Sequence, residues 1–188
     1  MSLASDVGSS SVTELSQSRC YHYQYSSICD SINGLYRSLK DQIEEQGYEA
    51  SRHYLESVLL SHKSAYLPDK FDGEFYLLNT DTTPLLRPHS PTLPDRGYVY
   101  VPNSSVKGNR PVDVGYESSV IGLSARRPLY GAVEPAWNLP MSSRRVPTDA
   151  VKGTFAAKQV VDLLGNKHNG LSNSLIVNTL DSQYVNAQ

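Results

Sequence analysis

Two aspartates follow short apolar segments that lie far apart in the sequence. Phe75–Leu78 is an aromatic and aliphatic run that ends in polar, turn-forming residues and leads to Asp81. Ser174–Leu180 runs in a similar way into Asp181. Apolar runs of this length, bounded by turn formers, predict buried strands. Carboxylate oxygens are the hard ligands that Mg²⁺ and Mn²⁺ prefer, so two aspartates at strand ends predict a divalent-metal site.

Each aspartate also has a simpler interpretation. Asp81 fits an Asx turn at a strand end, and Asp181 fits the N-cap of a helix that begins at Ser182. With a third acid the pair would hold two metal ions about 3.5–4 Å apart, which activate a nucleophile and stabilise the leaving oxygen in phosphodiester transfer. The five histidines are dispersed along the sequence, and we interpret each of them as a surface or packing residue.

The composition is that of a soluble protein. At 188 residues the chain is long enough to bury one core. Its first residues lack the basic start and apolar centre of a secretory signal, and no apolar run reaches the roughly 18 residues of a membrane span. Cys20 and Cys29 are the only cysteines, too few for a disulfide framework. We expect a cytoplasmic protein with reduced thiols and no membrane partner.

Charge is distributed unevenly along the chain. The net charge is −2, which argues against a wholly basic nucleic-acid binder. Residues 1–80 contain six Lys or Arg and eleven Asp or Glu, whereas residues 87–145 contain eight Lys or Arg and four Asp or Glu. This basic span lies between the two aspartates and suits a phosphodiester partner, although an ordinary solvated surface explains the same counts. Its basic residues are Arg87, Arg96, Lys107, Arg110, Arg126, Arg127, Arg144 and Arg145.

The first third of the chain predicts a disordered tail, residues 1–17, and a helical hairpin within residues 18–66. Over residues 18–46 the apolar side chains recur at steps of three and four, the period of an amphipathic helix. Gly47 is placed to end this helix, and a second helix is expected over residues 48–62. The hairpin is either a packing layer or a module for dimerisation or DNA binding. The first stripe consists of Tyr21, Tyr25, Ile28, Ile32, Leu35, Leu39 and Ile43.

Strands dominate the middle of the chain. Besides the run before Asp81, the pattern predicts strands over residues 98–101, 112–123 and 129–141. The last of these contains prolines, which suit an edge or bulged strand. We expect loops over Pro84–Arg96, with its four prolines, and over Ser142–Thr148.

A helix and a final strand close the predicted order. Residues 149–164 predict a helix that Thr148 or Asp149 caps and Gly165 ends. A strand that is reached through a helix fits best as a parallel neighbour in the same sheet. If its neighbour is the Asp81 strand, the two carboxylates lie side by side at one edge of the sheet.

Several segments resemble insertion-sequence transposases of the DDE type. Asp81-Thr82-Thr83-Pro84 begins a region similar to that around the first aspartate of these enzymes, and Asp181-Ser182-Gln183-Tyr184 lies in a region similar to the second-aspartate strand. The resemblance covers roughly residues 70–188. The segments that carry it are residues 81–90, 93–103, 107–116, 137–147 and 177–187.

The resemblance implies an RNase H-like core over residues 67–188, in which the first two acids lie on adjacent strands and bind Mg²⁺. Carried over, Asp81 and Asp181 are the catalytic and metal-binding acids, and the function is DNA transposition, a form of DNA recombination. The implied fold is α/β, a partial RNase H-like mixed sheet with a crossover helix, preceded by the helical hairpin. The implied contacts to DNA phosphates are Arg87, His89, Lys107, Arg110, Arg144 and Arg145.

The chain departs from this family in its third acid. Such enzymes use a third acid, usually a Glu on a helix after the second aspartate. No Glu follows Glu134 here, and the sequence ends seven residues after Asp181. We therefore expect a truncated transposase, from a truncated gene or a longer product, that binds DNA and holds Mg²⁺ or Mn²⁺ weakly. We do not expect it to be catalytically competent alone.

Two other functions stay open. In the first, the chain is a non-enzymatic protein that binds a partner, or forms a homo-oligomer, through the N-terminal apolar stripe. In the second, it is a Mg²⁺-dependent nuclease whose third acid is local, with Asp95, Asp113 and Glu134 as the candidates.

Overall fold

The computed structural model describes residues 25–71, 73–101, 112–125 and 138–180. Contacts divide the chain into two units, residues 1–55 and 56–188. The described residues form an α/β structure with a mixed sheet, as expected. In chain order the elements are α3 (Tyr25–Gln46), α4 (Tyr48–Lys63), a short 3-10 turn (Ser64–Tyr66), β1 (Phe75–Leu86), β2 (Gly97–Tyr100), β3 (Val112–Ser124), β4 (Asn138–Val146), α5 (Lys152–Gly165) and β5 (Leu175–Leu180).

The predicted break between the first two helices is confirmed at Gly47. This residue has φ +82°, a left-handed conformation that glycine adopts without steric cost. Its amide donates to the carbonyl of Ile43 at 3.0 Å, which satisfies one of the last carbonyls of α3. The apolar stripe of α3 is mostly uncovered, because Ile28 is buried whereas Ile32 and Leu35 are about half exposed (50 % and 53 %).

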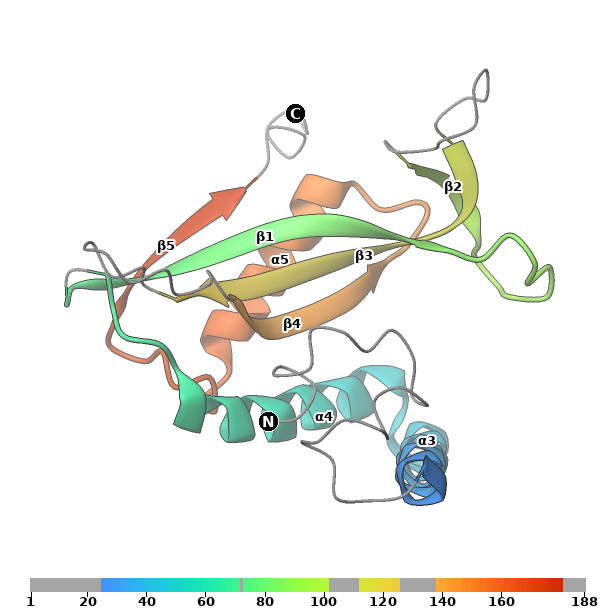
Figure 1. The fold of residues 1–188 in the computed structure, drawn as a ribbon, viewed down its shortest axis with the longest axis horizontal. Helices are drawn as coiled ribbons and strands as arrows, with labels where there is room; N and C mark the ends of the chain where they lie inside the picture. The colour runs from blue at the N-terminus through green and yellow to red at the C-terminus, as the bar shows by residue number, and fades with distance from the viewer. Residues whose placement is uncertain (1–24, 72, 102–111, 126–137, 181–188) are drawn as a thin grey trace. The chain divides into compact units, whose positions relative to one another are not determined.

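One five-stranded sheet forms the centre of the second unit (Figure 1). Its order is β2-β3-β1-β5, and β4 pairs with the edge of β3 that lies away from β1. The pairs of β3 with β1, β2 and β4 are antiparallel, whereas β5 pairs with β1 in parallel. The expected crossover is therefore confirmed, since α5 connects β4 to β5 and the last strand lies beside the Asp81 strand.

Within the second unit, helix covers one face of the sheet, and no described helix of residues 56–180 covers the other. Leu78 and Ile121, on neighbouring strands, pack in one cluster with Leu163 of α5 and Leu60 of α4. We call this side the covered face. In Figure 1, α5 lies behind the strands, so the viewer looks at the opposite side, which we call the open face. Alternate residues of a strand point to opposite faces, which assigns each strand residue to one side.

β1 does not end near Asp81, and this part of the prediction is wrong. The strand continues to Leu86, because its antiparallel pairing with β3 continues from Asp81–Val120 to Leu86–Gly115. Pro84 is tolerated within this run. The amide of Arg87 donates to the carbonyl of Val114 at 2.9 Å, so it points toward β3. Backbone nitrogens alternate between the two edges of a strand, and the Pro84 nitrogen, three residues earlier, therefore points to the edge away from β3.

β4 also differs from the prediction. It runs from Asn138 to Val146, so Arg144 and Arg145 lie in a strand and not in a loop. The register with β3 shifts between Ile121 and Gly122, which leaves Met141 as an extra residue in a bulge. Pro140 beside that bulge agrees with the expected irregular strand. The predicted start of this strand, residues 129–137, lies outside the described residues.

α5 begins at Lys152, three residues later than predicted, and its N-cap Val151 makes no side-chain capping bond. Thr148 does not cap it, since its hydroxyl hydrogen-bonds to Asp95. The buried residues of α5 are Ala156, Gln159 and Leu163. The side of the helix that faces the sheet therefore contains a small, a polar and an apolar residue. The amide group of Gln159 donates to the Ser119 carbonyl at 3.2 Å and to the Ser142 hydroxyl at 2.9 Å. No helix of the described residues is long and apolar enough to span a membrane.

Candidate functional site

Asp81 lies in the middle of β1, on the open face of the sheet. Its neighbours in the strand, Thr80 and Thr82, point to the covered face, and Thr80 is buried. The side chain of Asp81 is exposed, and Val120 lies opposite it on β3. One carboxylate oxygen, Oδ1, accepts a hydrogen bond from the amide of Thr82 at 2.7 Å. The result is an exposed carboxylate in the middle of a paired strand.

The parallel pairing of β1 with β5 ends next to both aspartates. Its last described pair is Thr80 with Leu180, the residues that directly precede Asp81 and Asp181. Asp181 itself lies outside the described residues. Side-chain hydrogen bonds hold the two strands together on both faces just before this point.

One of these bonds joins the register pair Asn79 and Thr179, and the other runs diagonally from Thr80 to Asn178, which is paired with Leu78. On the open face, the Thr179 hydroxyl donates to the Asn79 side-chain oxygen at 2.7 Å. On the covered face, the Thr80 hydroxyl donates to Asn178 Oδ1 at 3.1 Å. The four side chains fix the relative position of the strands where an acid follows each of them.

A row of polar side chains crosses the open face from β5 to β4. Asn79 accepts from Thr179, and its amide group donates to Ser124 of β3 and to Asn138 Oδ1 of β4 at 3.3 Å. Ser124 donates to the same Asn138 oxygen at 2.8 Å. This row was not predicted from the sequence. The pattern that could have predicted it is the alternation of the polar residues Asn79, Asp81 and Thr83 along one strand, which indicates a solvated sheet face.

The described residues supply one hard metal ligand at this position and not a complete site. The carboxylate chemistry of Asp81 fits Mg²⁺ or Mn²⁺. Among the described residues no three His, Cys, Asp or Glu side chains group together to hold a metal. Asp113 lies on β3, and its side chain is on the face of the sheet opposite to that of Asp81. Its Oδ1 accepts a hydrogen bond from the amide of Val114 at 2.7 Å. Glu134 lies outside the described residues.

Arg144 is part of a buried ion-pair network on the covered face. Its side chain is 10 % exposed, and it donates to both oxygens of Glu56 at 2.7 Å and to Asp162 Oδ2 at 2.6 Å. Burial lowers the pKa of Arg144, but the hydrogen bonds and charges of Glu56 and Asp162 outweigh it, so the pKa lies above its ordinary value. This guanidinium links β4 to α4 and α5.

Arg145, the next residue, lies on the open face and fixes a turn. Its guanidinium pairs with the Asp95 carboxylate, donates to the carbonyls of Pro94 and Asp95 at 3.0 Å each, and lies 4.1 Å from the ring centre of Tyr116. Asp95 has φ +57°, so these bonds hold a conformation that is uncommon outside glycine. The hydrogen bond from the Thr148 hydroxyl, with help from Arg145, keeps the pKa of Asp95 below its ordinary value.

The loop between β1 and β2 carries two of the predicted DNA contacts. Arg87 and His89 are both exposed. The loop is braced by its own hydrogen bonds, because the Arg96 side chain donates to the carbonyl of Arg87 at 2.8 Å and to that of Pro88 at 3.0 Å. Lys107 and Arg110 lie outside the described residues. The structure thus places Arg87, Arg144 and Arg145 in three separate environments and does not bring them together.

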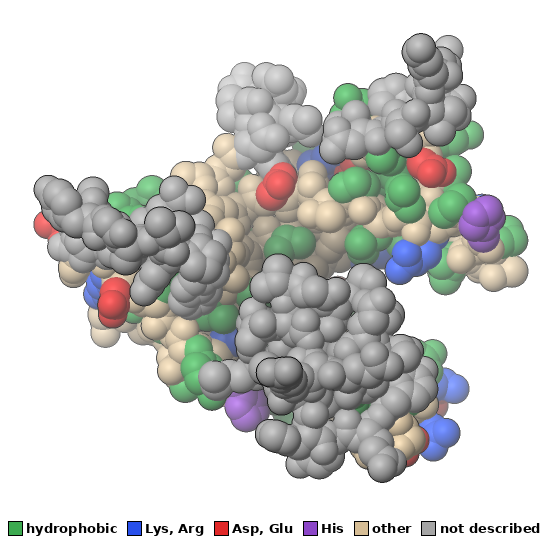
Figure 2. All heavy atoms as spheres, in the orientation of Figure 1, with side chains coloured by type: hydrophobic (Ala, Val, Ile, Leu, Met, Phe, Trp, Pro, Cys, Tyr) green, Lys and Arg blue, Asp and Glu red, His purple; other side chains and the backbone are tan. Residues whose placement is uncertain are grey.

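The surface of the open face is mixed in character. Figure 2 shows it as mainly backbone and uncharged polar atoms with separate hydrophobic patches, where described residues are visible. Lys and Arg side chains on this view are scattered and do not gather in one patch. Among the described residues, the charge asymmetry of the sequence therefore does not become one continuous basic surface on this side.

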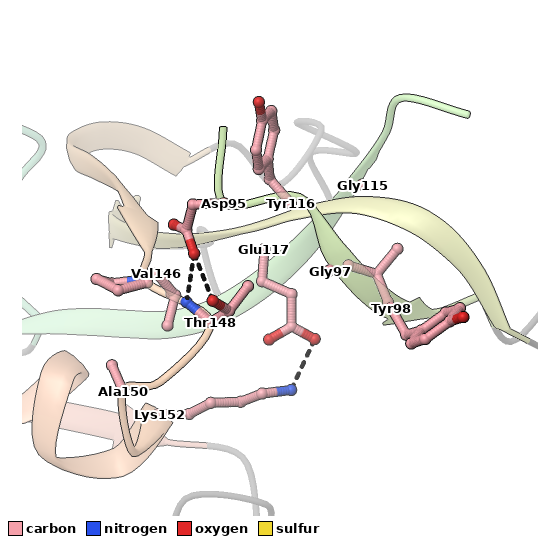
Figure 3. A pocket seen from close by; sticks show the side chains of 12 residues that line it. Asp95, Gly97, Tyr98, Gly115, Tyr116, Glu117, Val146, Thr148, Ala150 and Lys152 are labelled. Atoms are coloured by element: carbon pink, nitrogen blue, oxygen red, sulfur yellow. Dashed lines mark hydrogen bonds and ion pairs between the residues drawn. The ribbon is translucent and has the colours of Figure 1, made fainter. Parts of the chain in front are cut away.

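A pocket of about 210 Å³ lies where β2, β3 and the start of α5 meet (Figure 3). Its wall includes Tyr98, Tyr116 and the ion pair between Glu117 and Lys152, whose Oε1 and Nζ atoms are 2.7 Å apart. Figure 3 shows Glu117 pointing from β3 toward Lys152, with Tyr98 to one side of the pair. The sequence did not predict this pocket, since its residues come from three separate segments, 95–99, 115–117 and 146–152.

Comparison with known proteins adds no family. No protein-family model, no curated protein and no solved structure matches the chain.

Proposed function

We propose that the chain is the DNA-binding and metal-binding part of a DDE-type transposase. The observation that carries the proposal is the parallel pairing of β1 with β5, whose last described pair directly precedes Asp81 and Asp181. Two acids that follow paired positions on adjacent strands suit the binding of one divalent cation between them. Asp81 and Asp181 are the proposed ligands, and Mg²⁺ or Mn²⁺ is the proposed cation.

The architecture supports an RNase H-like core as the proposed fold. The resemblance implies two acids on adjacent strands of a mixed sheet and a crossover helix. The described residues include a parallel pair at the Asp81 strand, antiparallel neighbours and α5 as the crossover. The side-chain bonds of Asn79 with Thr179, and of Thr80 with Asn178, support a fixed spacing at the proposed site.

DNA is the proposed partner, and exposed basic residues are the proposed contacts. Arg87 and His89 are exposed on a braced loop, which allows them to contact phosphates without a rearrangement of the sheet. Lys107, Arg110, Arg144 and Arg145 remain proposed contacts from the resemblance. Arg144 is the weakest of them, because its guanidinium already binds two carboxylates. With no third acid grouped at Asp81 among the described residues, we propose binding, and not strand transfer, as the activity to measure.

Mn²⁺ binding tests the metal part of the proposal. We expect electron paramagnetic resonance to detect weak binding of Mn²⁺ that Asp81→Asn reduces about tenfold or more, because the ion loses a charged ligand. Asp113→Asn is a matched control. Asp113 also accepts a 2.7 Å bond from the next amide but lies on the other face. Equal loss in both variants, or no Mn²⁺ binding by the wild type, would contradict the metal site.

Fluorescence anisotropy with a labelled DNA duplex tests the nucleic-acid part. The affinity should fall steeply as salt rises, since contacts to phosphates release counterions, and Arg87→Ala should reduce the slope. Binding that is absent at low salt would overturn the proposal of a DNA partner.

One observation favours the second function, a protein that binds a partner through α3. Ile32, Leu35 and Ile43 of the predicted stripe are exposed, and an apolar stripe of this kind suits a second helix. Light scattering on the same samples distinguishes the two functions. If Ile32→Asp with Leu39→Asp abolishes oligomers and leaves DNA affinity unchanged, the helix is the interaction site and the DNA contacts lie elsewhere.

A further inference from the structure

We propose that the open face of the ribbon formed by β2 and the start of β3 binds unpaired nucleotides of a DNA strand. Tyr98 and Tyr100 are the proposed stacking surface, and Arg87 and Arg145 are the proposed phosphate contacts. The inference deepens the proposed DNA binding and rests on it for the identity of the polymer. It assigns a single-stranded segment of DNA to a surface that does not include Asp81.

The strand register places both tyrosines on the open face. Tyr98 pairs with Val114 of β3, and the even-numbered residues of this strand lie on the open face with Asp81. Because alternate residues of a strand point to opposite faces, Tyr98 and Tyr100 share this side, whereas Val99 between them is buried on the other. Figure 3 shows the Tyr98 ring pointing away from the ion pair of the pocket.

The two tyrosine rings are little used in packing. Tyr98 is 85 % exposed and Tyr100 is 56 % exposed. Their Cα atoms lie two residues apart on one strand, about 6.6 Å, so each ring can receive a separate base. Unpaired bases stack on exposed aromatic side chains in proteins that bind single strands, and every base has a face that can do so. Two such rings on one paired strand suit two neighbouring nucleotides.

Guanidinium groups lie beside the rings. The amide of Arg87 bonds to the Val114 carbonyl, which places this exposed residue one strand away from Tyr98 across β3. Toward β4, the Arg145 guanidinium lies 4.1 Å from the ring centre of Tyr116. Its hydrogen bonds to described residues come from Nη2, which leaves Nη1 and Nε as donors to a phosphate. The surface therefore combines rings for bases with cations for a phosphodiester backbone.

The extent of this surface favours a strand of nucleotides over a folded protein. Apart from the two tyrosines, its exposed apolar members among the described residues are Leu85 and Val112. A stable protein interface commonly involves roughly 20–30 residues on each partner. Four exposed side chains fall well short of that number, whereas two rings are enough to stack two bases.

Fluorescence anisotropy with a labelled oligothymidylate provides the first test. We expect Tyr98→Ala and Tyr100→Ala each to weaken its binding about tenfold, since loss of one stacked base has about that effect. Binding to a blunt duplex should be unchanged, because paired bases do not expose their faces. Tyr98→Phe, which keeps the ring, should bind as the wild type does. Tyr66→Ala is the matched control, since Tyr66 is similarly exposed (60 %) on the turn after α4.

The phosphate contacts have a separate readout. Arg87→Gln and Arg145→Gln should each lower the slope of log affinity against log salt concentration by about 0.7, the value for one phosphate contact with a single strand. Unchanged slopes in both variants would overturn the phosphate contacts.

The outcomes separate this inference from the proposed function. If the two tyrosine variants weaken single-strand and duplex binding equally, or weaken neither, the inference is overturned while the proposed DNA binding stands. If the wild type binds oligothymidylate through these tyrosines and binds no duplex, the inference stands and duplex binding is rejected. A change of oligomeric state in Tyr98→Ala and Tyr100→Ala, measured by light scattering, would show a protein interface and overturn the inference.

Photocrosslinking tests the wild-type protein directly. When 5-iodouracil replaces one thymine of the oligothymidylate, irradiation couples that base to an aromatic ring stacked on it. Mass spectrometry of the digested protein should locate the link at Tyr98 or Tyr100. Links found only at other tyrosines, with Tyr66 as the reference, would overturn the assignment of the stacking surface.

Discussion

Arg144 and Arg145 are neighbours in β4, yet their side chains lie on opposite faces of the sheet. Arg144 faces α4 and α5, is 10 % exposed and binds two carboxylates. Arg145 faces the open side, is 38 % exposed, and binds one carboxylate and the ring of Tyr116. In the sequence the two residues are equivalent members of a basic span. Because side chains alternate between the two faces along a strand, Arg144 forms interior ion pairs between elements and Arg145 holds a turn at the surface.

This difference shows that a basic residue type does not by itself indicate a phosphate contact. A guanidinium that is buried and paired stabilises the packing of the elements around it, and its removal takes a charged partner from each carboxylate. A guanidinium on the open side is screened by water and contributes less to stability. The two faces therefore predict different consequences for the same substitution.

Arg144→Ala has the largest expected effect on stability. We expect it to lower the free energy of unfolding by about 3 kcal/mol, because Glu56 and Asp162 then lose a buried partner. Urea unfolding, followed by far-UV circular dichroism, measures this change. A loss below that of Arg145→Ala would show that the network is less important than its burial indicates.

Arg145→Ala should have a smaller effect, of about 0.5–1 kcal/mol from its contact with the Tyr116 ring. It should also change the dependence of stability on pH. The pKa of Asp95 is lowered in the folded state, so its stabilising contribution is complete above its ordinary pKa and is lost as pH falls through the lowered value. Unfolding from neutral pH into acid should show this loss in the wild type. Asp95→Asn should remove it, and an unchanged profile would contradict the role of this carboxylate.

Two neighbouring serines give the most closely matched comparison. Ser118 lies on the open face, and its hydroxyl hydrogen-bonds to that of Ser143 at 3.0 Å. Ser119 lies on the covered face, 1 % exposed, and its hydroxyl has no hydrogen-bond partner among the described residues. We expect Ser118→Ala to cost about 1 kcal/mol and Ser119→Ala to be neutral or stabilising. Thermal unfolding distinguishes them, and equal losses would indicate a hidden partner for Ser119.

Sequence patterns predicted the elements better than their ends or faces. Runs of apolar residues predicted the strands at residues 112–123 and 174–180, and Gly47 predicted the break between two helices. The end of β1 was wrong, because pairing with β3 continues through polar residues to Leu86. In α5, hydrophobic periodicity does not account for the burial of Gln159, which bonds to the backbone and side chains of the sheet.

The candidate site also has features that the sequence predicts and features that it does not. The sequence by itself determined that an aspartate follows each of two apolar runs and that a helix precedes the last strand, because these are local patterns of residue type and period. Only the tertiary structure decided that β5 lies beside β1 in parallel, that Asn79 joins Thr179, and that Arg144 is an interior cross-link. Register and partner choice depend on which strands pair across long stretches of chain, and local patterns do not contain that information.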